Sequence, residues 1–162
     1  MAKKPSQKNA TPRIVNRRAR YDYHVLEKIE VGLVLLGSEV KSVRQGQVSL
    51  AEGYARIEPS DMQIYLHDVD IALYSHGGPA QHEPKRQRKL LAHSRQIKHL
   101  FALTTGKGTT LIPLTMYFVR GRVKLELGVA QGKRTHDKRQ TIKTREANRE
   151  IRRAMTRKVL RT

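Results

Sequence analysis

Side chains that could do catalysis or bind a metal are scattered along this chain. It has no cysteine, which excludes disulfides, thiolate metal sites and a cysteine nucleophile. Seven histidines are present, but no two have the i, i+4 spacing of a helical ligand pair, and His93 and His99 are six residues apart. Glu30 and Glu39 could act as paired acids, yet each has basic neighbours, so the sequence favours structural ion pairs for both.

The sequence does not match two further catalytic motifs. The segment TTGKGTT, residues 104–110, has the composition of a phosphate loop, but Lys107 is followed by Gly108 and Phe101 stands where the first glycine belongs. No serine lies in a G-x-S-x-G frame. We therefore expect neither a catalytic set nor a cofactor.

Positive charge is the dominant feature of the composition. The 162 residues include 33 Lys and Arg against 14 Asp and Glu, a formal net charge of +19. Seven of the basic residues and no acidic residue fall in 1–20, and 12 basic against 3 acidic fall in 131–162, so residues 21–130 are nearly balanced. Two cationic arms around a neutral body predict an anionic partner.

The segment NRRARYDY, residues 16–23, brings cations and aromatic rings together. Its members are Arg17, Arg18, Arg20, Tyr21 and Tyr23. Cations neutralise phosphates and rings stack on bases, so this mixture is typical of an RNA surface. A plain solvated start to the first strand remains the alternative.

The segment PKRQRK, residues 84–89, supplies a second cationic candidate in Lys85, Arg86, Arg88 and Lys89. We expect Pro84 to start an amphipathic helix that continues to Phe101. Cations at a helix N-terminus oppose its dipole, and a bound phosphate backbone would explain them. Simple tolerance of exposed charge is the other reading.

The last segment has too little apolar surface to fold alone. As a helix, residues 138–160 would carry one narrow apolar stripe surrounded by arginines, so we expect disorder in water and a helix against a polyanion. A helix of 32 residues would be about 48 Å long. A membrane-surface helix needs Trp, Phe or Leu on its apolar face, and Leu160 is the only one here, so RNA fits better than a membrane.

Hydrophobic periodicity predicts a β-rich body. Alternation predicts strands over 23–35, 54–58, 62–71, 109–119 and 122–130, with a turn at Arg120–Gly121. A short helix over 37–46, capped by Ser38, and the helix starting at Pro84 complete the pattern.

These elements favour a mainly β fold, an oligonucleotide-binding-type closed antiparallel β-barrel with two or three accessory helices. An open α+β sheet has the same periodicity and remains open. We divide the chain into a disordered basic arm (1–15), the RNA-binding body (16–130) and a basic tail (131–162). With no apolar signal region and no run longer than 31–37, the chain reads as soluble and intracellular.

In combination, five segments resemble the small protein B family, the transfer-messenger RNA-binding proteins of bacterial trans-translation. They are NRRARYDY (16–23), EVGLVLLGSEVKSVRQGQVSL (30–50), HEPKRQRKLLAH (82–93), KGTTLIPLTMYF (107–118) and GVAQGKRTHDKRQTIKTRE (128–146). The resemblance covers nearly all of the chain from residue 16.

This resemblance implies a cytoplasmic, monomeric RNA-binding protein with an oligonucleotide-binding-type barrel and no catalytic activity. Its barrel would bind the tRNA-like domain of transfer-messenger RNA (tmRNA), the SsrA RNA, and deliver it to stalled ribosomes. The tail would fold as a helix in the small subunit's empty mRNA channel, next to the decoding region. Elongation factor Tu and alanyl-tRNA synthetase would be partners through the shared RNA.

Carried over by position, Asn16, Tyr23 and Glu30 match family residues tied to the RNA-binding surface, and Glu39, Lys41 and Arg44 fall in its adjoining helix. The tail motif tied to the ribosome matches Gly132, His136, Asp137, Lys138 and Arg139, and Met155 falls on the tail helix. The other tail cations expected at the ribosome are Lys133, Arg134, Lys143, Arg145, Arg152 and Arg153.

Two other classes stay open on the residues alone. A ribosomal protein or RNA chaperone with a barrel and basic arms would bind RNA without preferring one tRNA-like ligand. An RNA-processing enzyme would need a convergent acid, base or metal set, which the sequence does not supply.

Overall fold

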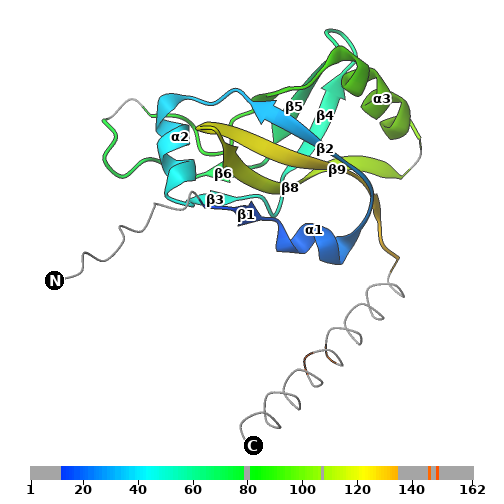
Figure 1. The fold of residues 1–162 in the computed structure, drawn as a ribbon, viewed down its shortest axis with the longest axis horizontal. Coiled ribbons are helices and arrows are strands. Elements are labelled where there is room, and N and C mark those ends of the chain that lie inside the picture. Colours follow the sequence, from blue (N-terminus) through cyan, green and yellow to red (C-terminus); the bar gives the residue numbers. More distant parts are fainter. Residues whose placement is uncertain (1–11, 79–80, 107, 135–145, 147–148, 150–162) are drawn as a thin grey trace, which may run out of the picture.

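The computed structural model describes residues 12–78, 81–106, 108–134, 146 and 149. Residues 1–11 of the arm that was expected to be disordered, and nearly all of the expected tail helix, therefore lie outside the described residues. Figure 1 shows the elements in chain order. They are β1 (Ile14–Val15), α1 (Arg17–Asp22), β2 (Tyr23–Leu33), α2 (Gly37–Arg44), β3 (Val48–Ser49), β4 (Tyr54–Glu58), β5 (Gln63–His67), β6 (Asp70–Ile71), β7 (Arg88–Leu91), α3 (Ser94–Thr104), β8 (Thr109–Val119) and β9 (Arg122–Gly132).

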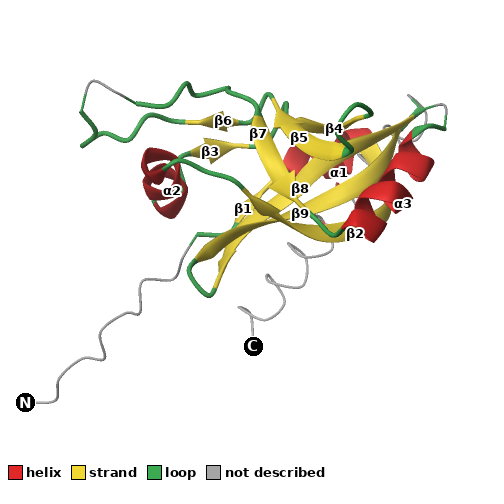
Figure 2. Cartoon of the chain, turned by 90° about the horizontal axis from the view of Figure 1, so that it is seen from above, coloured by secondary structure: helices red, strands yellow, loops and turns green. Residues whose placement is uncertain are grey.

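Seven antiparallel strands form one sheet in the order β1-β8-β4-β5-β7-β2-β9, and a further pairing of β8 with β9 closes six of them into a ring. β3 and β6 pair separately beside α2, as Figure 2 shows. The described part of the chain is thus mainly β with three helices, as predicted. The shortest ladder in the ring joins β4 and β8, which are paired only at Ala55 and Leu111.

Alternating side chains build the core inside this ring. In β9, Val123, Leu125, Leu127 and Val129 are all at most 7% exposed, as the predicted alternation requires. The alternation fails at Gly128 and Ala130, which are buried too, and Ala130 packs in a second small cluster with Ala19 of α1. The same pattern buries two residues each of β4 and β5. Because each buried aliphatic side chain contributes roughly 1.5–3 kcal/mol, this shared core holds the strands together.

The turn between the two longest strands also follows the prediction. Arg120 and Gly121 have φ angles of 48° and 78°, and Val119 pairs with Arg122 across them. Two successive residues with positive φ are typical of the two-residue turn that suits the twist of a β-hairpin.

The predicted strand over 62–71 is wrong in its second half. Asp68 has a φ of 54°, a left-handed conformation that ends β5 at His67. The chain then changes sheets, and β6 pairs with β3 instead of continuing beside β4.

The predicted helix from Pro84 to Phe101 is also wrong in its first half. Arg88 and Leu90 are buried whereas Lys89 and Leu91 are exposed, a period of two that makes this segment a strand. β7 fills the place between β5 and β2, and a sheet closed there has no room for a helix. The helix α3 begins only at Ser94.

Three local features near the first helices differ from expectation. The cap of α2 is Leu36 rather than Ser38, because the Glu39 carboxylate accepts the Leu36 N–H at 2.7 Å while Ser38 is hydrogen-bonded to His82. Ile14–Val15, assigned to the arm, form a strand with β8. The short helix α1 was not predicted, because only Ala19 in it is buried and no apolar period reveals it.

Candidate nucleic-acid interface

Helix α1 is fixed to the body by Asn16. The Asn16 amide nitrogen donates to the carbonyl oxygens of Leu50 at 2.7 Å and Pro113 at 2.9 Å, and its amide oxygen accepts the Ala19 N–H at 2.9 Å. The side chain is buried, so Asn16 holds the helix in place and presents little surface of its own. Arg17, Arg18 and Arg20, the predicted cations, are all exposed on this helix.

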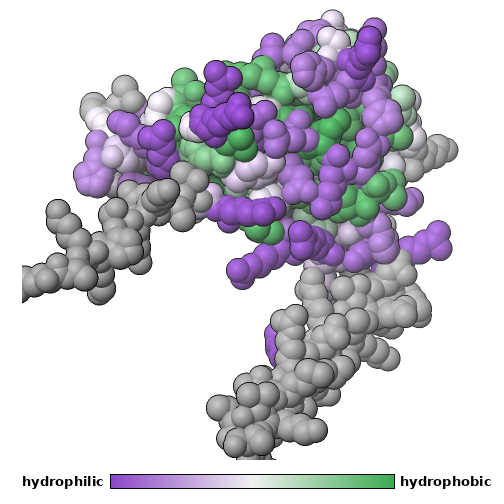
Figure 3. Space-filling view, viewed as in Figure 1, coloured by the Kyte–Doolittle hydropathy of each residue, from purple (hydrophilic) through white to green (hydrophobic). Residues whose placement is uncertain are grey.

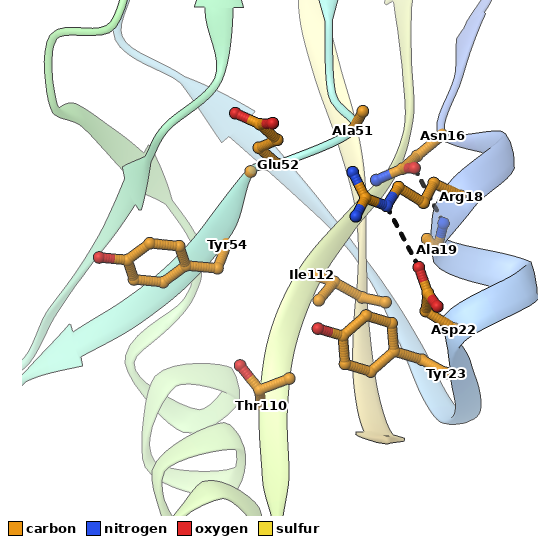
Figure 4. A pocket seen from close by; sticks show the side chains of 11 residues that line it. Asn16, Arg18, Ala19, Asp22, Tyr23, Ala51, Glu52, Tyr54, Thr110 and Ile112 are labelled. Carbon is orange, nitrogen blue, oxygen red and sulfur yellow. Dashed lines mark hydrogen bonds and ion pairs between the residues drawn. The ribbon is translucent and has the colours of Figure 1, made fainter. Parts of the chain in front are cut away.

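Beside α1 the surface is hollowed into a cavity of about 370 Å³. In Figure 4, Arg18 and Tyr23 reach in from the side of α1, Tyr54 comes from β4, and Ile112 of β8 lies between them. Arg18 forms an ion pair with Asp22 at 3.3 Å. Figure 3 shows hydrophilic side chains projecting along the lower edge of the body, where Figure 1 places α1. The hollow therefore combines one cation, Arg18, with two aromatic rings and the carboxylates of Asp22 and Glu52.

Glu30 lies on the outer face of β2 in a small polar cluster. Its carboxylate accepts a hydrogen bond from the Tyr117 hydroxyl and forms an ion pair with Lys124 at 3.2 Å. The hydrogen bond from Tyr117, followed by that from Lys124, lowers the pKa of Glu30, and the same Glu30 contact raises the pKa of Tyr117 to about 12. Glu30 is therefore an anion that orients its two neighbours, in agreement with the predicted ion pair.

Glu39 and Arg88 do not lie on the surface. Both side chains are fully buried, and the Arg88 Nε donates to Glu39 Oε1 at 2.8 Å. Arg86, about a quarter exposed, donates to both carboxylate oxygens. Burial alone would raise the pKa of Glu39, but the hydrogen bonds from Arg86, the Leu36 N–H and Arg88 hold it below its ordinary value. The phosphate contact expected of Arg88 is wrong, because its guanidinium is used inside the protein.

The remaining predicted cations of the body are exposed. Lys41 and Arg44 of α2 lie over the rings of Tyr74 and Phe118, at 5.0 and 5.8 Å from the ring centroids. Lys85 pairs with Glu52 at 3.5 Å, and Lys89 points outward from β7. The structure thus places the cations on separate elements, with α2 and β7 joined by Glu39.

The tail begins at a defined contact. β9 extends to Gly132, and the Lys133 N–H and Nζ donate to the carbonyl oxygens of Asp22 at 2.9 Å and Arg20 at 3.0 Å at the end of α1. Arg134 is exposed. The other tail candidates lie outside the described residues: His136, Asp137, Lys138, Arg139, Lys143, Arg145, Arg152, Arg153 and Met155.

Three residues of these clusters were missed from the sequence: Tyr54, Tyr117 and Lys124. Tyr117 and Lys124 are cross-strand partners, a relation that the predicted turn at 120–121 already fixed. Tyr54 begins the alternation of β4 on its exposed side. Within the described ranges no group of three His, Asp or Glu side chains could hold a metal ion. No described helix is long and apolar enough to cross a membrane.

A ring of antiparallel strands that carries exposed cations and rings on its helices and edges defines a mainly β, polyanion-binding class of protein. The family described as SmpB protein matches residues 13–157, and the chain belongs to this family.

Similar proteins agree with this membership. The chain is 46% identical over 160 residues to the SsrA-binding protein of Corynebacterium diphtheriae, which covers 98% of this chain and 97% of the relative. It is 45% identical over 158 residues to the SsrA-binding protein of Mycolicibacterium smegmatis, with 98% and 97% covered. A solved structure described as "tmRNA-SmpB: a journey to the center of the bacterial ribosome" matches with a TM-score of 0.66 and 43% identity, over 81% of this chain and 94% of that one.

Proposed function

We propose that this protein binds the tRNA-like domain of tmRNA and delivers it to stalled ribosomes for trans-translation. The observation that carries the proposal is the family match over residues 13–157, together with full-length relatives named for SsrA binding. In this process translation passes from the broken message to the reading frame in the RNA, and the unfinished peptide is tagged for degradation.

The body recognises the RNA. Exposed Arg17, Arg18 and Arg20 supply phosphate contacts on one element, and Asn16 sets their position through three hydrogen bonds. Tyr23 adds a ring at the same hollow. Supporting contacts come from the Glu30 cluster and from Lys41, Arg44, Lys85, Arg86 and Lys89. Glu39 and Arg88 act indirectly, by holding the elements that carry these cations.

The tail, residues 131–162, serves the ribosome. Its 12 basic residues match a channel lined by RNA, and we infer that it occupies the empty mRNA channel as a helix, with His136 stacked on a base. The contacts of Lys133 with α1 support a fixed starting point for the tail next to the RNA-binding body.

Several finer features belong to the same proposal. The ring of six strands is of the oligonucleotide-binding type, and the protein is a cytoplasmic monomer without catalytic activity. Elongation factor Tu and alanyl-tRNA synthetase meet it through the shared RNA. The strand order of the ring supports the barrel type.

Sequencing the RNA that copurifies with the protein from cells tests the function. We expect strong enrichment of tmRNA over its share of total RNA. Bulk ribosomal RNA without that enrichment would favour a ribosomal protein or RNA chaperone. Specific cleavage of the recovered RNA by the purified protein would favour an enzyme.

A further inference from the structure

A groove crosses the ring where its ladder is shortest. β4 and β8 are paired only at Ala55 and Leu111, and two hollows meet there. The first is the hollow of about 370 Å³ beside α1; the second, of about 460 Å³, lies between β4 and α3. Tyr54 and Thr110 line both, so together the hollows run from α1 to α3. We name this feature the seam groove.

Tyr54 presents a free ring face to the seam groove. Tyr54 as a residue is 40% exposed, and its ring stacks on His67 of β5, with centroids 5.1 Å apart and 14° between the planes. His67 lies on the side of β4 away from β8. The second face of the Tyr54 ring is therefore turned towards β8 and the groove. A ring held in this way loses little freedom when a base stacks on it.

The α3 side of the groove offers hydrogen-bond acceptors. Thr104, Thr105 and Thr109 use their hydroxyl hydrogens inside the protein, on the carbonyl oxygens of Leu100, Phe101 and Leu103. Each hydroxyl oxygen keeps lone pairs that can accept a hydrogen bond. A ribose 2′-OH and the amino groups of unpaired bases are suitable donors.

The charges in the groove suit a phosphate backbone. Arg18 lies in the hollow beside α1 and Arg56 in the hollow beside α3. The carboxylates in the first hollow belong to Asp22, paired with Arg18, and Glu52, paired with Lys85 at 3.5 Å. The second hollow has no acidic residue among its lining residues. Cations thus stand on both sides of the Tyr54 ring.

We propose that the seam groove binds a short unpaired stretch of RNA, with one base stacked on Tyr54 and phosphates near Arg18 and Arg56. This inference rests on the proposed function and adds a contact surface to it. Paired bases present no free face, so a duplex does not fit the Tyr54 ring.

The sequence allows a direct optical test, because the chain has no tryptophan. A Tyr54→Trp variant carries a single indole in the groove. Hexa-adenylate should quench its fluorescence by about half or more through stacking, and a six-base-pair RNA duplex should not. A Val119→Trp variant is the matched control, because Val119 lies at the other end of β8, about 30 Å from Thr110, and its emission should stay unchanged.

Affinity provides the second readout. Tyr54→Ala and Arg56→Gln should each weaken hexa-adenylate binding about tenfold, whereas Arg120→Gln at the β8–β9 turn should not. Tight binding of the tRNA-like domain without quenching by hexa-adenylate would overturn the groove inference and leave the proposed function standing. Quenching by hexa-adenylate without selective binding of the tRNA-like domain would overturn the proposed function and leave the groove inference standing. Quenching by peptides but not by RNA would assign the groove to a protein partner and overturn the inference.

Discussion

Arg88 Nε donates a 2.8 Å hydrogen bond to Glu39 Oε1 across 49 residues of sequence, and neither side chain has surface exposed to water. The same guanidinium donates to the carbonyl oxygens of Val69 at 2.7 Å and Pro84 at 2.8 Å. One buried cation therefore joins α2, β7 and the segments around β6. The buried Glu39–Arg88 pair therefore holds α2, and with it the exposed cations of α2, in position on the body.

Glu39→Gln should destabilise the protein by about 3–5 kcal/mol at pH 7, because it leaves the buried Arg88 without a counter-charge. Urea unfolding followed by circular dichroism measures the change. Glu58→Gln, on the exposed side of β4, is the control and should change stability by less than about 0.5 kcal/mol. An equally small effect of Glu39→Gln would show that the pair contributes little to folding.

The same pair predicts how stability depends on pH. The pKa of Glu39 is lowered in the folded state, so its contribution is present above the unfolded value of about 4.3 and is lost as pH falls through the folded value. Wild-type stability should therefore fall more steeply below about pH 4.5 than that of Glu39→Gln. Parallel curves in thermal unfolding over this range would contradict the lowered pKa.

Asn16→Ala should lower the free energy of unfolding by about 2–4 kcal/mol, because it removes the cap of α1 and three hydrogen bonds from a buried side chain to the backbone. Binding of the tRNA-like domain should weaken as well, because α1 positions three arginines. Calorimetry and a filter-binding titration measure the two effects. Arg17→Ala, which keeps the cap, should weaken binding with almost no loss of stability; the opposite order of effects would refute the positioning role of Asn16.

Binding should weaken steeply with salt. Each phosphate neutralised on single-stranded or duplex RNA adds roughly 0.7–0.9 to the slope of log affinity against log salt. Replacing Arg17, Arg18 and Arg20 together with Gln should lower that slope by about two units. Arg95→Gln, on the exposed side of α3, should leave it unchanged. An unaltered slope in the triple variant would mean that α1 does not contact phosphates.

The tail should be separable from RNA binding. A chain that ends at Lys133 keeps both contacts with α1, so its affinity for the tRNA-like domain should stay within about tenfold of the full chain. Peptide tagging on stalled ribosomes in a reconstituted translation system should be abolished. A chain that ends at Gly132 should lose about 1 kcal/mol more stability. Tagging by the shortened chain would contradict the assigned role of the tail.

Hydrophobic periodicity predicted the elements in which the order of apolar and polar residues matches the order of buried and exposed side chains. The strands β2 and β9 and the turn at Arg120–Gly121 were placed correctly, because apolar and polar residues alternate over most of both strands. The second half of β9 departs from that order, since Gly128 and Ala130 are buried as well. The helix predicted from Pro84 to Phe101 was wrong in its first half, because the basic and leucine residues there fit a helical face as well as a strand. Only the position of β7 between β5 and β2 decides between them.

The candidate interface was predictable where charge and rings are neighbours in the chain. Arg17, Arg18, Arg20 and Tyr23 share one segment, and Arg18 and Tyr23 line the same hollow. The burial of Arg88 was hidden, because its partner Glu39 is 49 residues away and the sequence offers no measure of that distance. The seam groove likewise depends on the register of two strands, which no local pattern specifies.

Competition binding tests the selectivity of the body most directly. The chain ending at Lys133 is bound to the labelled tRNA-like domain of tmRNA at about 150 mM salt, and unlabelled RNAs are added. We predict that ordinary tRNA and fragments of ribosomal RNA need at least about tenfold higher concentrations than the unlabelled domain to displace it. Displacement by all of these RNAs at the same concentration would contradict recognition by the folded body.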